Sequence, residues 1–229
     1  MVSFFSSQAL WHTSKGLRPY PQALEQMTQW VQAIADGQQP QRVWLIEHPP
    51  LYTLGTSAKE QDVLGTHTVP TYASGRGGQT TYHGPGQRVV YVMLNLNHRQ
   101  RDLHQYIRDL EAWLILALSK LGVDAFRREG RVGIWVETSS GESKIAAIGV
   151  RVQKWITSHG IALNVCPDLD YFKGIIPCGL QHYGVTSLQA LGKAHTLQDV
   201  DTVLHQSFQE TFQIALEESI EEQTPLGSV

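Results

Sequence analysis

The sequence is poor in charged residues, in net charge and in long hydrophobic runs, and each shortage excludes a class of protein. Only 17% of its 229 residues are charged and 41% are hydrophobic, which excludes a disordered chain and favours one globular domain. A formal net charge of −3 gives no global basic surface for nucleic acid or for an anionic membrane. The longest apolar run, Ala112–Leu118, is far shorter than the roughly 20 residues of a membrane-spanning helix.

Cysteine is scarce as well. Cys166 and Cys178 are too few for a disulfide scaffold, and the start of the chain, Met1–Phe5, has neither early basic residues nor an apolar stretch of signal-peptide length. We therefore expect reduced thiols and a cytoplasmic protein. No histidine pair has zinc-ligand spacing, and neither a Cys-x-x-Cys pair nor a phosphate-loop motif occurs, so we expect no metal and no cofactor.

The pattern of apolar residues predicts one α+β domain. Helical spacing is found in three segments: Pro21–Ile34, residues 101–122 and Leu197–Phe212, the last after a possible capping box at Thr196 and Asp199. Apolar runs bounded by turn residues predict five strands: Val43–Ile46, Val89–Leu96, Val132–Val136, Ile145–Val152 and Trp155–Val165. We expect residues 1–216 to form a single domain and residues 217–229 to be an acidic, disordered tail.

One long segment is unusually rich in glycine. Arg76–Gln87 contains four glycines and a proline among polar side chains, just before a predicted strand. Glycines let backbone amides approach a ligand closely, and Arg76, Thr80, Tyr82 and His83 offer oriented polar groups. A rigid structural loop explains the same residue types equally well.

Two side chains that could take part in catalysis, one thiol and one amine, lie outside that loop. Cys178 lies in a bend between Pro177 and Gly179, which can expose a thiol, although a lone cysteine is more often a small buried residue. Cys166 follows a strand and fits the buried, packing role better. Lys144 opens an otherwise apolar strand, where it is either a solvated strand end or a buried amine.

These pieces together resemble one family. Their order and spacing along nearly the whole chain are similar to those of the octanoyltransferase family, lipoyl(octanoyl) transferases of lipoate biosynthesis, and the matching segments are Pro49–Gly55, Arg76–Gln87, Gly141–Gly149, His159–Asn164 and Pro177–Gly179. One position departs from the resemblance, because Gln79 stands where that family commonly carries an acidic residue. Any charge-dependent role at that position is therefore in question.

The resemblance implies both a fold and a site. The fold would be similar to the catalytic domain of biotin and lipoate protein ligases, an α+β domain with a mixed, largely antiparallel sheet flanked by helices. Cys178 would be the nucleophile that forms the acyl thioester, and Lys144 would act on the protonation of Cys178. The substrate-binding residues that it implies are Arg76, Gly77, Gly78, Gln79, Thr80, Thr81, Tyr82, His83, Ala147, Ile148, Gly149, Gly160, Ile161 and Ala162.

The implied activity is acyl transfer between two proteins. An octanoyl or lipoyl group would pass from an acyl carrier protein to a specific lysine of a lipoyl domain in 2-oxoacid dehydrogenase complexes or of the glycine cleavage H protein. Exchange of one thioester for another, followed by amide formation, needs no ATP. Two other classes stay open: an ATP-dependent lipoate or biotin protein ligase, and an acyl-binding module without catalysis.

A basic cluster suggests a docking surface. Arg127, Arg128 and Arg131, with Arg151 and Lys154 further along, concentrate positive charge in a chain that is net negative. Because acyl carrier proteins are typically acidic, these residues are a candidate docking patch, and a solvated loop is the alternative.

Overall fold

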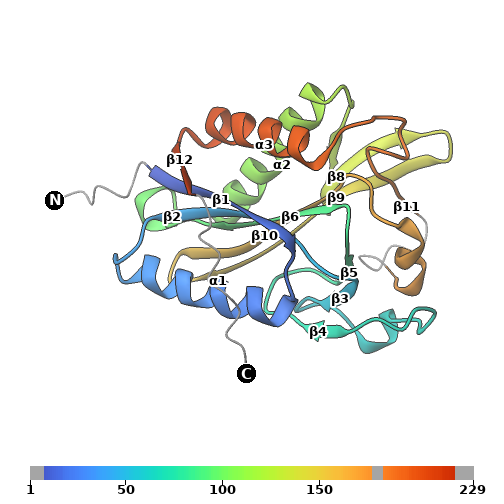
Figure 1. Cartoon of the computed structure of the whole chain (residues 1–229), viewed down its shortest axis with the longest axis horizontal. Coiled ribbons are helices and arrows are strands. Elements are labelled where there is room, and N and C mark those ends of the chain that lie inside the picture. The colour runs from blue at the N-terminus through green and yellow to red at the C-terminus, as the bar shows by residue number, and fades with distance from the viewer. Residues whose placement is uncertain (1–7, 177–182, 220–229) are drawn as a thin grey trace.

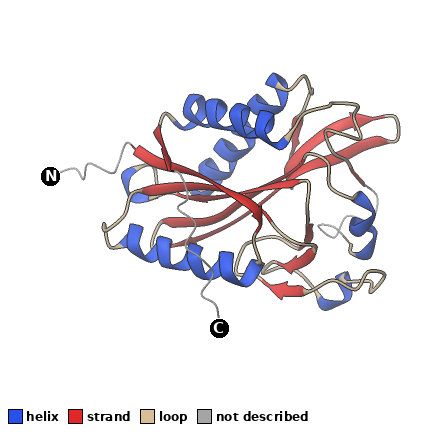
Figure 2. Cartoon of the chain, viewed as in Figure 1, coloured by secondary structure: helices blue, strands red, loops and turns tan. Residues whose placement is uncertain are grey.

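The protein is a two-sided α+β domain built on one large sheet. A computed structural model describes residues 8–176 and 183–219. Helices α2 (Leu103–Lys120) and α3 (Leu197–Phe212) cover one face of the sheet, and α1 (Tyr20–Ala35) covers the other (Figures 1 and 2). Short 3-10 turns occur at Glu60–Asp62, Leu96–His98 and Leu169–Gly174. The fold is of the α+β class that the sequence predicts.

The large sheet is mixed but mostly antiparallel. Along its width the strands run β12 (Ala215–Ser219), β1 (Gln8–Leu17), β2 (Gln41–Glu47), β6 (Gln87–Met93), β10 (Ile156–Asn164), β9 (Gly141–Gln153), β8 (Arg131–Thr138) and β7 (Phe126–Arg128). Strand β1 is parallel to both neighbours, and the short β11 (Gly184–Val185) pairs parallel with β9. A small second sheet consists of β4 (Thr71–Ala73), β3 (Leu51–Leu54) and β5 (Thr80–His83).

The helix ends follow the capping signals in the sequence. The Asp102 side chain accepts a hydrogen bond from the Gln105 amide at the start of α2. Thr196 and Asp199 form the reciprocal capping box at the start of α3, as their spacing predicts. Pro21 occupies the first turn of α1, where its missing amide hydrogen costs nothing. All three predicted helices are therefore confirmed.

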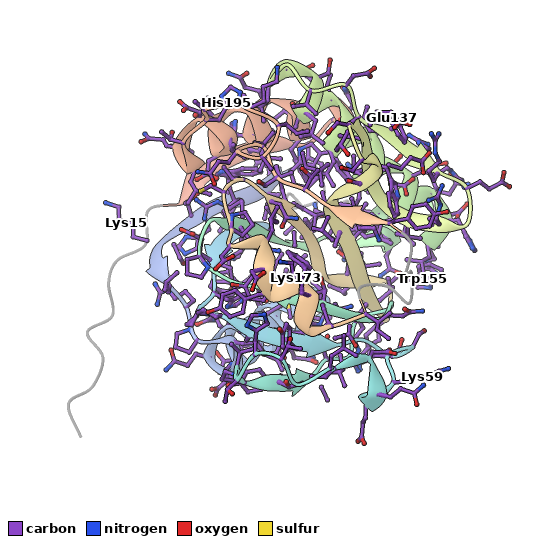
Figure 3. The ribbon with its side chains drawn as sticks, turned by 90° about the vertical axis from the view of Figure 1, so that its right-hand side faces the viewer. Lys15, Lys59, Glu137, Trp155, Lys173 and His195 are labelled. Atoms are coloured by element: carbon purple, nitrogen blue, oxygen red, sulfur yellow. The ribbon has the colours of Figure 1, made fainter. Side chains whose placement is uncertain are left out.

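Two hydrophobic clusters hold the layers together. The larger one lies between the sheet and α2 and α3 and includes Trp113, Leu114 and Phe208, all with no exposed surface. The smaller one packs α1 onto the other face through Met27, Trp44 and others. Charged side chains such as Lys15, Lys59, Glu137 and Lys173 project from the outside of the molecule (Figure 3). No helix among the described residues is long and apolar enough to cross a membrane.

The short strands β3, β4, β5, β7 and β11 were not predicted, and the structure differs from the sequence-based expectations in three further places. Strand β1 was not predicted, because its mixed composition shows no clear alternation. The acidic tail was expected from residue 217, but Ala215–Ser219 pair parallel with β1 as β12, so strand structure continues to Ser219. Cys166 was expected to pack inside the protein and is exposed, since it lies just beyond the end of β10.

Candidate functional site

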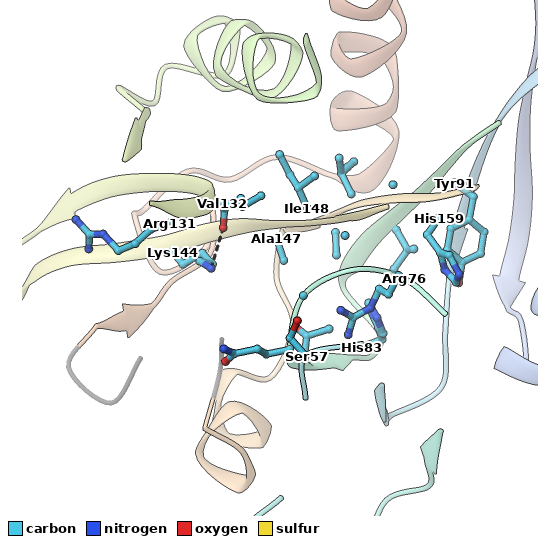
Figure 4. A pocket seen from close by; sticks show the side chains of 18 of the residues that line it. Ser57, Arg76, His83, Tyr91, Arg131, Val132, Lys144, Ala147, Ile148 and His159 are labelled. Atoms are coloured by element: carbon cyan, nitrogen blue, oxygen red, sulfur yellow. Dashed lines mark hydrogen bonds between the residues drawn. The ribbon is translucent and has the colours of Figure 1, made fainter. Parts of the chain in front are cut away.

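A cavity of about 280 Å³ opens on the face of the sheet that α1 covers. Its floor is formed by β6, β9 and β10, and the loop that precedes β5 closes it from the other side (Figure 4). Most of the predicted site residues that the structure describes line it: Arg76, Gly78, Gln79, Thr81, His83, Lys144, Ala147, Ile148, Gly149, Gly160, Ile161 and Ala162. Segments far apart in the sequence thus meet around one cavity.

The floor consists of two rows of residues across the sheet, and the members of both rows on β9 and β10 are alanine or glycine. In one row Ala162 of β10 pairs with both Val89 and Ala147, and in the next Gly160 pairs with both Tyr91 and Gly149. Residues two apart on a strand share a face, so both rows face the cavity. Between them, Val90 and Ile161 face the larger hydrophobic cluster. The middle of the floor is therefore almost free of side chains.

A β-bulge turns Lys144 toward this cavity. Ile134 of β8 pairs with Ala146, but its neighbour Trp135 pairs with Lys144, so β9 carries one extra residue at Ile145. Ile145 and Ala146 both belong to the larger hydrophobic cluster, as expected when two successive residues share a face at a bulge. Without the extra residue, Lys144 would point to the opposite face from Ala147 and Gly149.

The Lys144 side chain is buried and held in place. It is 8% exposed, its Nζ donates a hydrogen bond to the carbonyl oxygen of Val132 at 3.2 Å, and it lies 4.9 Å from the centre of the Trp135 ring. Gly133 makes room for it, because a Cβ there would lie 3.2 Å from the Lys144 Cε and 2.8 Å from the Ala146 oxygen. Of the two sequence-based alternatives, the buried amine is the one observed.

A chain of hydrogen bonds connects Arg76 of the glycine-rich loop to strands β3, β5 and β6. The Arg76 Nη2 donates to the Thr53 Oγ1 at 2.8 Å, and the Thr53 Oγ1 lies 3.2 Å from the His83 Nε2. The His83 Nδ1 lies 2.7 Å from the Gln87 Oε1, which can only accept, so Nδ1 carries the proton in neutral His83. His83 Nε2 is then the acceptor for the Thr53 hydroxyl. Each hydrogen bond in this chain therefore has a defined donor and a defined acceptor.

The same chain reaches the segment beside Lys144. The Gln87 Nε2 donates to the Asn164 Oδ1 at 3.0 Å, and the Asn164 Nδ2 donates to the Thr186 carbonyl at 2.9 Å. The Thr186 amide in turn donates to the Lys144 carbonyl at 3.0 Å. The loop around Arg76 and the strand that carries Lys144 are therefore parts of one hydrogen-bonded unit.

Three buried histidines near the cavity are uncharged at neutral pH. Burial lowers the pKa of His48 to about 4 and that of His159 to about 3, and the positive charge of Arg76 acts in the same direction on His159. Burial also holds the pKa of His83 well below its usual value, as do the nearby His48 and Arg76. These rings contribute hydrogen bonds and shape rather than charge.

Three predicted substrate-binding residues do not line the cavity. Thr80 and Tyr82 alternate along β5 with Thr81 and His83 and so face away from it. The Tyr82 ring stacks on Tyr171 at 4.9 Å. Gly77 ties the loop to β9 by donating its amide hydrogen to the Val150 oxygen at 2.8 Å.

Several lining residues were not predicted from the sequence. They are Tyr20, Ser57, Val89, Tyr91, Gly130, Arg131, Val132 and His159. His159 lies next to the predicted Gly160 and has a φ of +57°, a conformation more typical of glycine or asparagine. Arg131 was considered only for docking. The others lie in α1, in the loop after β3, in β6 and in the β7–β8 hairpin, and carry no local signal.

Cys178 lies outside the residues that the structure describes, but both flanking segments are described. On one side, the Ile176 amide donates to the Asp62 oxygen at 2.8 Å, and Ile175 forms a β-bridge with Val63. On the other side, Gly184 and Val185 pair in register with Ser143 and Lys144. In sequence, Cys178 follows Ile176 by two positions.

The candidate docking arginines are partly neutralised. Arg128 and Arg131 both form ion pairs with Glu142, and the Arg127 Nε lies 3.9 Å from the Glu111 carboxylate. The arginines lower the pKa of Glu142, so this carboxylate is charged at neutral pH. The cluster is therefore a mixed-charge surface. Within residues 8–176 and 183–219, no group of three or more His, Cys, Asp or Glu side chains is arranged to hold a metal ion.

Comparison with known proteins identifies close relatives of the chain. Residues 19–209 match the family described as the lipoyl protein ligase A/B catalytic domain. The chain is 52% identical over 210 residues to an octanoyltransferase of Gluconacetobacter diazotrophicus, with 89% of this chain and 90% of the relative covered. It is 53% identical over 220 residues to that of Acidiphilium cryptum, with 93% and 96% covered.

Solved structures share the fold at much lower identity. A bipartite lipoate protein ligase from Thermoplasma acidophilum superposes with a TM-score of 0.69 at 16% identity and covers 94% of this chain and 87% of its own. A lipoate-protein ligase A bound with ATP gives a TM-score of 0.68 at 18% identity, with 95% and 90% covered. The fold similarity to lipoate protein ligases, expected from the sequence, is confirmed.

Proposed function

This chain belongs to the lipoyl protein ligase A/B catalytic-domain family and, within it, to the octanoyltransferases, acyltransferases of lipoate biosynthesis; on that premise we propose its donor, acceptor and intermediate. The donor is an acyl carrier protein that carries an octanoyl thioester. The acceptor is a lysine of a lipoyl domain, in 2-oxoacid dehydrogenase complexes or in the glycine cleavage H protein. The group passes through a thioester on Cys178, in the cytoplasm.

The observation that carries this proposal is the placement of Lys144. A bulge in β9 and the absence of a side chain at Gly133 let the buried amine reach the cavity. The described segments on either side of Cys178 are tied to the 3-10 turn at Asp62 and to β9 at Lys144. The anchor on β9 supports pairing of Cys178 with Lys144.

The proposed reaction has two balanced steps. The Cys178 thiolate forms a bond to the carbonyl carbon of the carrier thioester, the C–S bond to the carrier breaks, and the carrier thiolate leaves and takes up a proton from the Lys144 ammonium. The acceptor amine then attacks the same carbon, so that an amide forms and the Cys178 thiolate leaves. A positive Lys144 favours the thiolate, and a neutral Lys144 accepts the proton that the incoming amine must lose.

A transfer assay tests this proposal against the ATP-dependent alternative. Purified protein is mixed with octanoyl carrier protein and a lipoyl domain without ATP, and in parallel with free octanoate and ATP. We expect the domain to gain one octanoyl group only in the first mixture, because thioester exchange needs no activation. Transfer only in the second mixture would identify a ligase. Binding of the acyl group without transfer in either would identify a non-catalytic module.

A further inference from the structure

The cavity has a reactive end and a closed end. Lys144 lies at one end, beside Val132, and Tyr91 and His159 lie together at the other (Figure 4). Ala147 lies between them on β9. A chain attached near Lys144 can therefore extend along the floor of the sheet toward these two rings.

The floor between the two ends suits an unbranched chain. The row nearer Lys144 contains Ala147 and Ala162, and the next row contains Gly149 and Gly160. The two rows are two residues apart along the strands, a separation of about 6.8 Å. Small residues leave the floor open, and the first large side chain of the farther row is Tyr91, paired with Gly160.

The closed end is rigid. The Tyr91 hydroxyl lies 2.8 Å from the His48 Nε2, and the His48 Nδ1 lies 2.6 Å from the Arg18 carbonyl oxygen. Because a carbonyl only accepts, Nδ1 of neutral His48 carries the proton, and Tyr91 donates to Nε2. The Tyr91 and His159 rings meet at 90° with centres 5.9 Å apart, and the His159 amide donates to the Met27 sulfur.

The closed end of the cavity can receive the apolar end of an acyl chain. The Tyr91 hydroxyl is already bonded to His48 and both histidines are neutral, so no buried charge faces the cavity from these rings. Arg76 and Arg151 are the charged neighbours of His159; Arg76 lines the cavity and its Nη2 is bonded to Thr53, whereas Arg151 does not line the cavity. A terminal methyl group therefore meets ring surfaces at this end of the cavity.

We propose that Tyr91 and His159 form the wall that sets the length of acyl chain that this enzyme accepts. The proposal rests on the proposed function and adds to it two residues that determine specificity for the length of the acyl chain. Shorter chains leave the space before the wall empty, and longer chains collide with it. Discrimination in an apolar pocket amounts to roughly 10–200-fold for each methylene.

The test compares a series of donors in wild type and in variants. The donors are carrier proteins that carry hexanoyl, octanoyl, decanoyl or dodecanoyl chains, and kcat/KM is measured for each with one lipoyl domain. His159→Gly removes a ring at a position whose φ of +57° suits glycine, and Tyr91→Leu shortens the other ring. We expect the dodecanoyl-to-octanoyl ratio to rise about tenfold or more in either variant.

A filling variant and a matched control complete the experiment. Ala147→Leu, at a half-buried position on the floor, should move the preference toward hexanoyl. Met93→Ala also removes buried volume from β6, two residues from Tyr91, but Met93 does not line the cavity, so the profile should not move. Unchanged ratios in His159→Gly, Tyr91→Leu and Ala147→Leu, with an active wild type, would overturn the wall. A wild type inactive with all four donors would instead contradict the proposed function.

Discussion

The two faces of the central sheet differ in kind, although the same strands build both. The face toward α2 and α3 carries mostly buried apolar residues, such as Val90, Ile134 and Ile161, and its one described ion pair with α3 joins Arg88 to Asp201. The face toward α1 carries alanines, glycines, neutral histidines and Lys144 around a cavity. Packing on one face therefore stabilises the fold, and the other face is left open enough to hold a substrate.

Replacing the cavity amine with a permanent cation should have the largest effect on turnover. Arg stays protonated, so Lys144→Arg can still favour a thiolate but cannot accept a proton from the acceptor amine. We expect Cys178 to be acylated by octanoyl carrier protein, while transfer to the lipoyl domain slows by about 10²–10⁴-fold. Single-turnover measurements of the two half-reactions decide this. Equal slowing of both steps, or near-normal transfer, would remove the proton-carrying role from Lys144.

The space beside Lys144 can be tested without changing the lysine itself. Gly133→Ala places a Cβ against the Lys144 side chain and the Ala146 oxygen, and its φ of +122° also strains any other residue. We expect turnover to fall by about 10²-fold in protein that still folds, because a shift near 1 Å suffices.

The matched control for this change lies in the same hairpin. Gly141 has a φ of +98°, but a Cβ at Gly141 would meet no atom within 4 Å. Gly141→Ala should therefore lower stability by about 1–3 kcal/mol and leave turnover per folded molecule intact. If both variants lost turnover equally, backbone strain rather than the position of Lys144 would be responsible.

The buried histidines should make the cavity face sensitive to acid. The folded-state pKa of His159 is about 3, far below its ordinary value near 6.5, so the unfolded chain binds more protons between these values. Stability therefore rises with pH across this window and is lost as pH falls. Between pH 6 and pH 4, the free energy of unfolding should change with pH less steeply in His159→Asn than in wild type. The expected difference in slope is about 1.4 kcal/mol per pH unit. An unchanged slope in denaturant titrations would show that His159 is not buried as a neutral ring.

The smallest effect is expected at the exposed thiol. Cys166 lies outside both hydrophobic clusters and outside the cavity. Cys166→Ser should keep stability within about 0.5 kcal/mol of wild type and keep full transfer activity. A large loss of activity would mean that Cys178 is not the sole essential thiol.

Local patterns predicted the three α-helices and five of the strands but not the face of the sheet that Lys144 occupies. The helix with Leu110, Trp113 and Leu114 follows from spacing alone, and the loop at Arg76 follows from motif resemblance. The bulge at Ile145 does not, because a run of apolar residues shows no alternation from which an extra residue can be detected. The position of Lys144 at the cavity depends on that bulge.

Contacts between residues far apart in the sequence could not be predicted from local patterns either. Tyr91 and His48 meet across 43 positions in sequence, and Asn164 meets Thr186 across 22. Each of these residues is ordinary in its local context, so only the assembled sheet shows the hydrogen-bond chain and the closed end of the cavity. The prediction for Cys166 was wrong: the short apolar strand before it suggested burial, but Cys166 is exposed.

Detection of the acyl-enzyme tests most directly whether the cavity face carries cysteine chemistry. Wild type and Cys178→Ala are incubated with octanoyl carrier protein without ATP or acceptor, then digested and examined by mass spectrometry. We expect one octanoyl group on the peptide that contains Cys178 in wild type, removed by adding a lipoyl domain, and none in the variant. An octanoylated lipoyl domain formed at the wild-type rate by Cys178→Ala would contradict the thioester mechanism.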